Sequence, residues 1–169
     1  MCSRTYPMRQ RLALFEQVVT ATLLYGSASW TMTTARSQLL RSVQRSMLRR
    51  VVGIIRQDGE TYVEWIQRST HVAEHHYCRS GGESWVVQHR RRCWKWARHI
   101  ARATDARWAS RLLYWHPRGS RRQGRPVKRW TDDLDAFFTS KMGSYLGEWA
   151  CYAADREGWR SWKDDFVYK

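Results

Sequence analysis

The chain has 169 residues, of which 43% are hydrophobic and 14% aromatic, and it carries 30 Lys and Arg residues against 15 acids. This length suits one ordinary domain or two small ones, and the apolar content excludes a chain that is disordered by composition. The formal net charge of +15 predicts a polyanionic partner, with nucleic acid as the first candidate and an anionic membrane surface as the second.

The sequence offers no segment that would place the chain in or across a membrane. It contains no apolar run of the roughly 18 residues that a membrane-spanning helix needs. The N-terminal stretch lacks the apolar core of a signal peptide. The four cysteines are widely spaced and show no disulfide pattern, which fits a reducing compartment. We therefore expect an intracellular protein of the nucleus or cytoplasm that is not secreted.

Two amphipathic helices are predicted within residues 1–56. The first covers residues 9–25 and ends at Gly26, because glycine adopts the left-handed conformation of a helix C-terminus without steric cost. Thr33 or Thr34 caps the second, which runs to about Val52. Apolar residues recur at helical spacing in both helices, namely Leu12, Phe15, Val19, Thr22 and Leu23 in the first and Leu39, Leu40, Val43, Met47, Leu48 and Val51 in the second. We expect the two stripes to pack together as an antiparallel helical hairpin.

The rest of the chain is also predicted to be helical, which gives an all-α fold. A connecting part, residues 57–83, holds a helix over 60–78 and ends in Ser80-Gly81-Gly82, which we interpret as a hinge. A basic helical region, residues 84–169, follows. Its expected helices cover residues 84–103, residues 105–115, the stretch from Val127 or Lys128 through Phe138, and residues 148–166.

The positive charge is concentrated in one segment. Residues 90–129 carry 14 Lys and Arg and one acid, whereas residues 130–169 carry five and eight. A solvated surface usually mixes charges of both signs, so this surplus favours a nucleic-acid surface. Within it, residues 117–129 hold six Lys and Arg, two glycines and two prolines without apolar periodicity, which predicts a flexible Arg-rich loop that a polyanion would order.

Five tryptophans lie in or beside the same basic segment: Trp94, Trp96, Trp108, Trp115 and Trp130. Their rings could stack on bases, but large aromatic residues mostly supply buried area, so we favour the core for them. Trp94, Ile100 and Leu112 are candidate core positions of two helices. Trp94 and Trp130 are expected mainly to support the fold.

Two groups of residues could carry metal chemistry. Asp132 and Asp133 form an acidic pair of the kind that binds Mg²⁺ in polymerases, but they fall in the first turns of an expected helix, where acids complement the helix dipole, and we favour that structural role. His75 with Cys78 and His89 with Cys93 have spacings found in zinc sites, and competing histidines nearby make this match weak. We expect no cofactor and retain zinc as an alternative.

Five short motifs occur in an order that resembles a known family. They are LLYGSASW at Leu23–Trp30, LLRSVQRSMLRRVVGI at Leu39–Ile54, RRRCWKWARHIAR at Arg90–Arg102, RRQGRPVKRWTDDL at Arg121–Leu134 and WACYAADREGW at Trp149–Trp159. This series resembles the C-terminal part of non-LTR (LINE-like) retrotransposon reverse transcriptases, which are RNA-directed DNA polymerases. The resemblance covers residues 10 to 162, with a poor match around residues 62–82.

The resemblance implies a thumb-like hairpin over residues 1–56 and a region downstream of the thumb over residues 84–169. The family's catalytic aspartates belong to a palm domain, so it implies no polymerase activity for this chain alone and a missing palm and fingers domain as a partner. The expected partner is RNA or DNA, bound through its phosphates. No membrane is expected as a partner. The expected phosphate contacts are Arg45 and Arg49 in the thumb-like part and Arg90, Arg91, Arg92, Arg121, Arg122, Arg125, Lys128 and Arg129 in the basic region. Two alternatives stay open, namely a standalone nucleic-acid-binding adaptor and a degenerate element remnant without a selected function.

Overall fold

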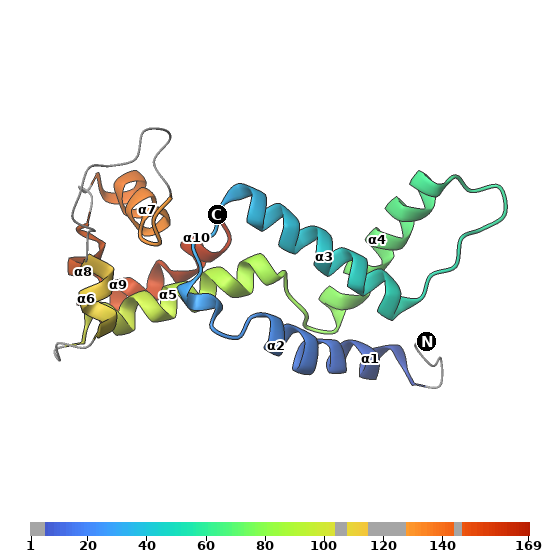
Figure 1. Cartoon of the computed structure of the whole chain (residues 1–169), viewed down its shortest axis with the longest axis horizontal. Coiled ribbons are helices and arrows are strands. Elements are labelled where there is room, and N and C mark those ends of the chain that lie inside the picture. Colours follow the sequence, from blue (N-terminus) through green and yellow to red (C-terminus); the bar gives the residue numbers. More distant parts are fainter. Residues whose placement is uncertain (1–5, 104–107, 115–127, 144–146) are drawn as a thin grey trace. The chain divides into compact units, whose positions relative to one another are not determined.

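The computed structural model of the chain describes residues 6–103, 108–114, 128–143 and 147–169. Every regular element in these ranges is a helix and none is a strand, which confirms the all-α prediction (Figure 1). No described helix has the length and apolar character needed to cross a membrane. The chain divides into unit 1, residues 1–27 and 33–89, and unit 2, residues 28–32 and 90–169. The hairpin, connecting part and basic region expected from the sequence stay a prediction.

Unit 1 begins with three helical segments that follow one another without a break: α1 (Met8–Leu14), the π-helix η1 (Phe15–Thr20) and α2 (Ala21–Leu23). The helix predicted over residues 9–25 is therefore present, and Gly26 follows it with a φ of 65°. The apolar periodicity did not indicate the wider π-helical turn, in which hydrogen bonds join residues five apart. That turn brings Phe15 and Thr20 to the same buried side.

The helix α3 (Thr34–Val52) begins and ends where the sequence predicted. The Thr33 hydroxyl oxygen accepts a hydrogen bond from the Arg36 amide at 3.2 Å, and Gly53 ends the helix with a φ of 71°. One residue of the predicted apolar stripe does not face the core, because Leu39 is 64% exposed. The polar residue Gln44 is buried instead. Gln44 is tolerated there because its amide group donates to the Glu83 carbonyl at 3.2 Å and accepts from the Trp85 amide at 3.0 Å.

The helix α4 (Tyr62–Arg79) matches the helix predicted over residues 60–78. Thr61 and Glu64 form a reciprocal capping box at its start, in which each side chain accepts a hydrogen bond from the other residue's amide. The helix ends before the predicted Ser80-Gly81-Gly82 break, where Gly81 has a φ of 83°. Whether this break acts as a hinge stays a prediction.

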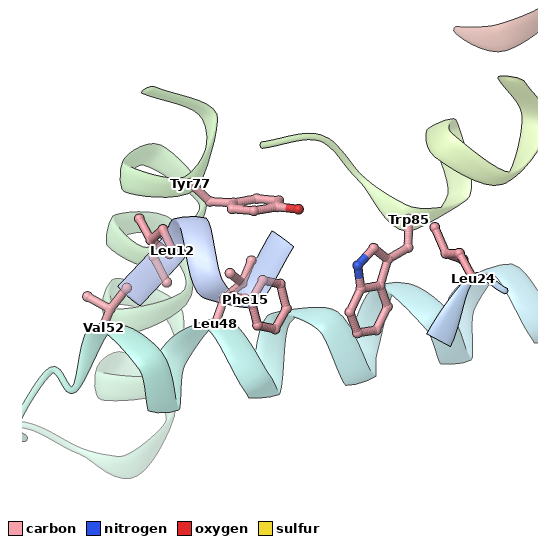
Figure 2. Packing of buried hydrophobic residues seen from close by; sticks show 8 residues of the cluster. Leu12, Phe15, Leu24, Leu48, Val52, Tyr77 and Trp85 are labelled. Atoms are coloured by element: carbon pink, nitrogen blue, oxygen red, sulfur yellow. The ribbon is translucent and has the colours of Figure 1, made fainter. Parts of the chain in front are cut away.

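The core of unit 1 joins the first helical run to α3, α4 and the start of α5 (Trp85–Ala101) (Figure 2). Phe15 lies stacked on Trp85, with ring centroids 5.8 Å apart, and meets Tyr77 edge-on at the same distance. The Trp85 indole donates to the Thr20 hydroxyl at 2.8 Å. Tyr77 donates a short hydrogen bond to the Glu16 carboxylate. Aromatic packing and a satisfied polar network therefore hold this unit together.

Unit 2 contains the rest of α5 followed by short helices. These are α6 (Trp108–Tyr114), α7 (Asp132–Met142), α8 (Trp149–Tyr152), α9 (Arg156–Ser161) and α10 (Lys163–Val167). One predicted boundary is wrong, because α7 begins at Asp132 rather than at Val127 or Lys128. Residues 148–166 are helical as predicted, in three short helices with a break before α9. The break arises because Asp155 has an extended backbone, and its carboxylate accepts hydrogen bonds from the amides of Glu157 and Gly158 at the start of α9.

Trp94 lies at the centre of the unit 2 core. Its indole stacks on Trp159 with ring centroids 3.9 Å apart and donates to the Trp159 carbonyl at 3.2 Å. Phe137, Phe138 and Phe166 surround the same ring. Trp94 and Ile100 are buried as predicted, but Leu112 is 62% exposed, so its assignment to the core was wrong.

Candidate nucleic-acid interface

A groove of about 270 Å³ lies on one side of α3 in unit 1. Its lining residues are Gln38, Arg41, Ser42, Arg45 and Arg49. The arginines recur every four residues, so successive guanidinium groups lie one helical turn apart on the same face. Among the residues that the structure describes, no acid lines this groove, although the Glu74 carboxylate pairs with Arg45 at its side. The lining side chains offer three guanidinium groups, a hydroxyl and an amide, all of which can donate hydrogen bonds to phosphate oxygens.

Two of these arginines are held in place by α4. The Arg45 guanidinium forms an ion pair with the Glu74 carboxylate at 2.7 Å, and both side chains are substantially exposed. The Arg49 guanidinium donates to the Thr70 hydroxyl at 2.9 Å. A planar guanidinium has five N–H donors, so each of these contacts leaves others for a ligand. Arg41, which the sequence analysis did not select, is exposed on the same face.

The arginines at the N-terminal side of α5 in unit 2 bind the last residues of the sequence. Arg90 donates a short hydrogen bond to the Lys169 carbonyl, and Arg91 donates to the Tyr168 hydroxyl at 3.1 Å. Arg92 is half-buried and has contacts within the chain. The three residues predicted as phosphate contacts therefore also have structural partners.

The predicted Arg-rich loop lies mostly outside the described residues, and with it Arg121, Arg122 and Arg125. At its end, the Lys128 ammonium group donates to the Met32 carbonyl and pairs with the Asp133 carboxylate, both at 2.6 Å. Arg129 is exposed. Of these two predicted contacts, Arg129 presents its charge to solvent, whereas Lys128 has most of its donors engaged.

A second basic cluster, which the sequence analysis missed, gathers at the end of α5. The Arg102 guanidinium donates through Nε to the Ala153 carbonyl at 2.6 Å. Desolvation lowers the pKa of Arg102, and the positive charges of Arg156 and Arg98 lower it further. Arg98 and Arg156 are both exposed. The Asp155 carboxylate acts in the opposite direction and offsets part of this positive charge, and arginine remains protonated at neutral pH.

The acidic pair occupies the first turn of α7, as the structural interpretation predicted. The Asp132 carboxylate accepts a hydrogen bond from the Arg129 amide at 2.7 Å, and Asp133 pairs with Lys128. Both carboxylates therefore lie in the first turn, where they complement the helix dipole, and both contact the basic residues just before the helix.

The structure does not support the zinc alternative in the part of the chain that it describes. No group of three His, Cys, Asp or Glu side chains there is placed to hold a metal ion. His75 and Cys78 are exposed on α4, and His89 is buried. Cys93 is also buried, and its thiol donates to the Ala28 carbonyl at 3.4 Å. Burial is the main cause that raises the pKa of Cys93 to about 12.

This pKa predicts slow alkylation of Cys93. Only the thiolate attacks an alkylating reagent, and a raised pKa keeps the group protonated at pH 8. Iodoacetamide should therefore modify the exposed Cys78 and Cys151 of the folded chain while Cys93 stays unmodified. Peptide mass spectrometry would measure this, with the denatured chain as the control in which all three react. Equal rates for Cys93 and Cys78 in the folded chain would contradict the buried position.

Comparison with known proteins finds similarity to a transposon-derived protein. The chain is 32% identical over 152 residues to a transposon-derived protein of Caenorhabditis elegans. The match covers 88% of this chain and 52% of the relative, so the chain spans about half the length of the protein that it resembles. No protein-family model and no solved structure matches the chain.

Proposed function

We propose that the chain binds nucleic acid through phosphate contacts, as a non-catalytic part of a retrotransposon reverse transcriptase. The observation that carries this proposal is the α3 groove, where Arg41, Arg45 and Arg49 share one helix face and Glu74 pairs only with Arg45 among them in the part of the chain that the structure describes. The exposed Arg98 and Arg156 of unit 2, whose charges act on Arg102, add further positive charge to this proposal. Template, primer or element RNA would be the ligand, with catalysis left to a palm and fingers domain.

Two further lines of evidence support the reverse transcriptase origin and the nucleic-acid ligand. The five sequence motifs resemble the thumb and downstream region of non-LTR reverse transcriptases, and the matched relative is transposon-derived. The charge of residues 90–129 and the net +15 of the chain suit a polyanion. A location in the nucleus or cytoplasm belongs to the same proposal.

A pair of variants on α3 tests whether the groove is a site or merely part of a basic surface. At about 100° per residue, Arg50 points to the opposite face of α3 from Arg41. Arg41→Gln and Arg50→Gln therefore remove the same charge from the same exposed helix. We expect Arg41→Gln to reduce the slope of log K against log salt by about 1 on duplex DNA, and Arg50→Gln to leave it nearly unchanged.

Removing all three groove arginines should have a larger effect. The variant with Gln at Arg41, Arg45 and Arg49 should lose about 2 to 3 units of slope, because each phosphate contact contributes about 0.9. Fluorescence anisotropy over a salt series measures it, with circular dichroism as the check on folding. Equal losses in Arg41→Gln and Arg50→Gln would instead show binding by bulk charge alone, which is the behaviour expected of a degenerate remnant.

A further inference from the structure

Trp108 differs from the other tryptophans whose side chains the structure describes in the basic segment. It is 73% exposed, whereas Trp94 is buried and Trp96 and Trp130 are half-buried. The Trp130 indole donates to the Ala28 carbonyl at 2.7 Å, so that ring is fixed within unit 2. An indole that presents most of its surface to water gives up the burial that usually stabilises a tryptophan.

A cation lies over the exposed indole. The guanidinium carbon of Arg111, one turn further along α6, is 5.6 Å from the centre of the Trp108 ring. This cation–π contact restrains the ring on one side and places donors for a phosphate beside it. A flat ring next to a guanidinium is the arrangement that binds an unpaired nucleotide, because the base stacks while its phosphate is paired.

We infer that Trp108 and Arg111 form a stacking site for an unpaired base, so that the chain takes single-stranded nucleic acid as well as duplex. The inference rests on the proposed function and extends it to a ligand class. The net charge of residues 90–129, which surround α6 in the sequence, complements a nucleic-acid strand. A membrane anchor would present a continuous apolar face, whereas Arg111 lies beside the exposed Trp108 and Leu112 in the described part of this helix.

The test compares two ligands of similar length, a labelled oligo-dT strand and a labelled DNA hairpin, with wild type and Trp108→Ala. Stacking on one aromatic side chain is worth on the order of 5- to 100-fold in affinity. Trp108→Ala should weaken binding of the single strand by that factor and leave hairpin binding within twofold. Trp108→Phe should retain most of the single-strand affinity, because its ring still offers a face.

Leu112→Ala is the matched control, since it removes another exposed apolar side chain from α6 and should change neither affinity. Equal losses on strand and hairpin, or no loss on either, would overturn the stacking site. Vesicles of anionic phospholipid serve as a third ligand. If Trp108→Ala weakened binding to these vesicles and to neither nucleic acid, the stacking site would also be overturned. A wild-type chain that binds neither nucleic acid at low salt would instead contradict the proposed function itself.

Discussion

Replacing Trp94 by alanine should lower the free energy of unfolding by about 3–5 kcal/mol, the range for deleting a large aromatic side chain from a core. The indole is 2% exposed and packs against four other aromatic rings of unit 2, so its loss leaves a cavity that short helices cannot close. The Trp159 carbonyl would also lose the hydrogen bond from the indole. Urea unfolding followed by circular dichroism measures the change.

Trp108→Ala supplies the control for that measurement, because it removes the same side chain from an exposed position of the same unit. Its effect should stay within about 0.5 kcal/mol, as for most surface substitutions. If the two variants were destabilised equally, the central position of Trp94 would be wrong.

Replacing Trp85 by alanine should destabilise unit 1 by a similar amount, about 3–5 kcal/mol. Its side chain is fully buried, stacks on Phe15 and donates to the Thr20 hydroxyl inside the π-helical turn. The change would therefore remove apolar burial together with the ring stacking and the hydrogen bond that join the indole to η1. The midpoint and slope of urea unfolding give the free energy.

Trp85→Phe separates the two contributions. It keeps a six-membered ring that can stack on Phe15 and deletes the indole N–H together with the rest of the five-membered ring, so we expect a cost of about 1–3 kcal/mol, below that of the alanine variant. A phenylalanine variant as unstable as the alanine variant would contradict a core held mainly by ring packing, and a neutral alanine variant would contradict the buried position altogether.

The helices that could be predicted are those whose signals are local. The start of α3 at Thr33 or Thr34 and its end near Val52 were predicted from capping and periodicity, and Trp94 and Ile100 were predicted to lie in the core. The capping box of Thr61 and Glu64 is equally local, and its T-x-x-E spacing was available to find it. Local rules suffice here because caps and periodicity depend on neighbours within one or two turns.

The features that were missed depend on residues distant in the sequence. Gln44 is buried because the backbone near Glu83 and Trp85 supplies its hydrogen bonds, and nothing near Gln44 indicates those partners. The π-helical turn likewise brings Thr20 to the indole of Trp85. Propensity and pattern cannot foresee such tertiary partners.

The candidate interface also combines a local feature that was predicted with distant contacts that were not. Counting charges located the basic surplus, but not which guanidinium groups have partners within the fold. Arg90 and Arg91 donate to residues 169 and 168, and Arg102 donates to Ala153, across more than fifty positions in each case. Arg41 was overlooked because a solvated arginine and a groove arginine look alike in a helical pattern.

The measurement that tests the central claim most directly is a salt titration of the wild-type chain with labelled RNA and DNA hairpins, with a circular dichroism melt of the same sample. We expect a cooperative melt and a linear fall of log K with log salt, with a slope of roughly −3 or steeper for several phosphate contacts on duplex DNA. Absence of binding at about 50 mM salt, where phosphate contacts are strongest, would contradict the account.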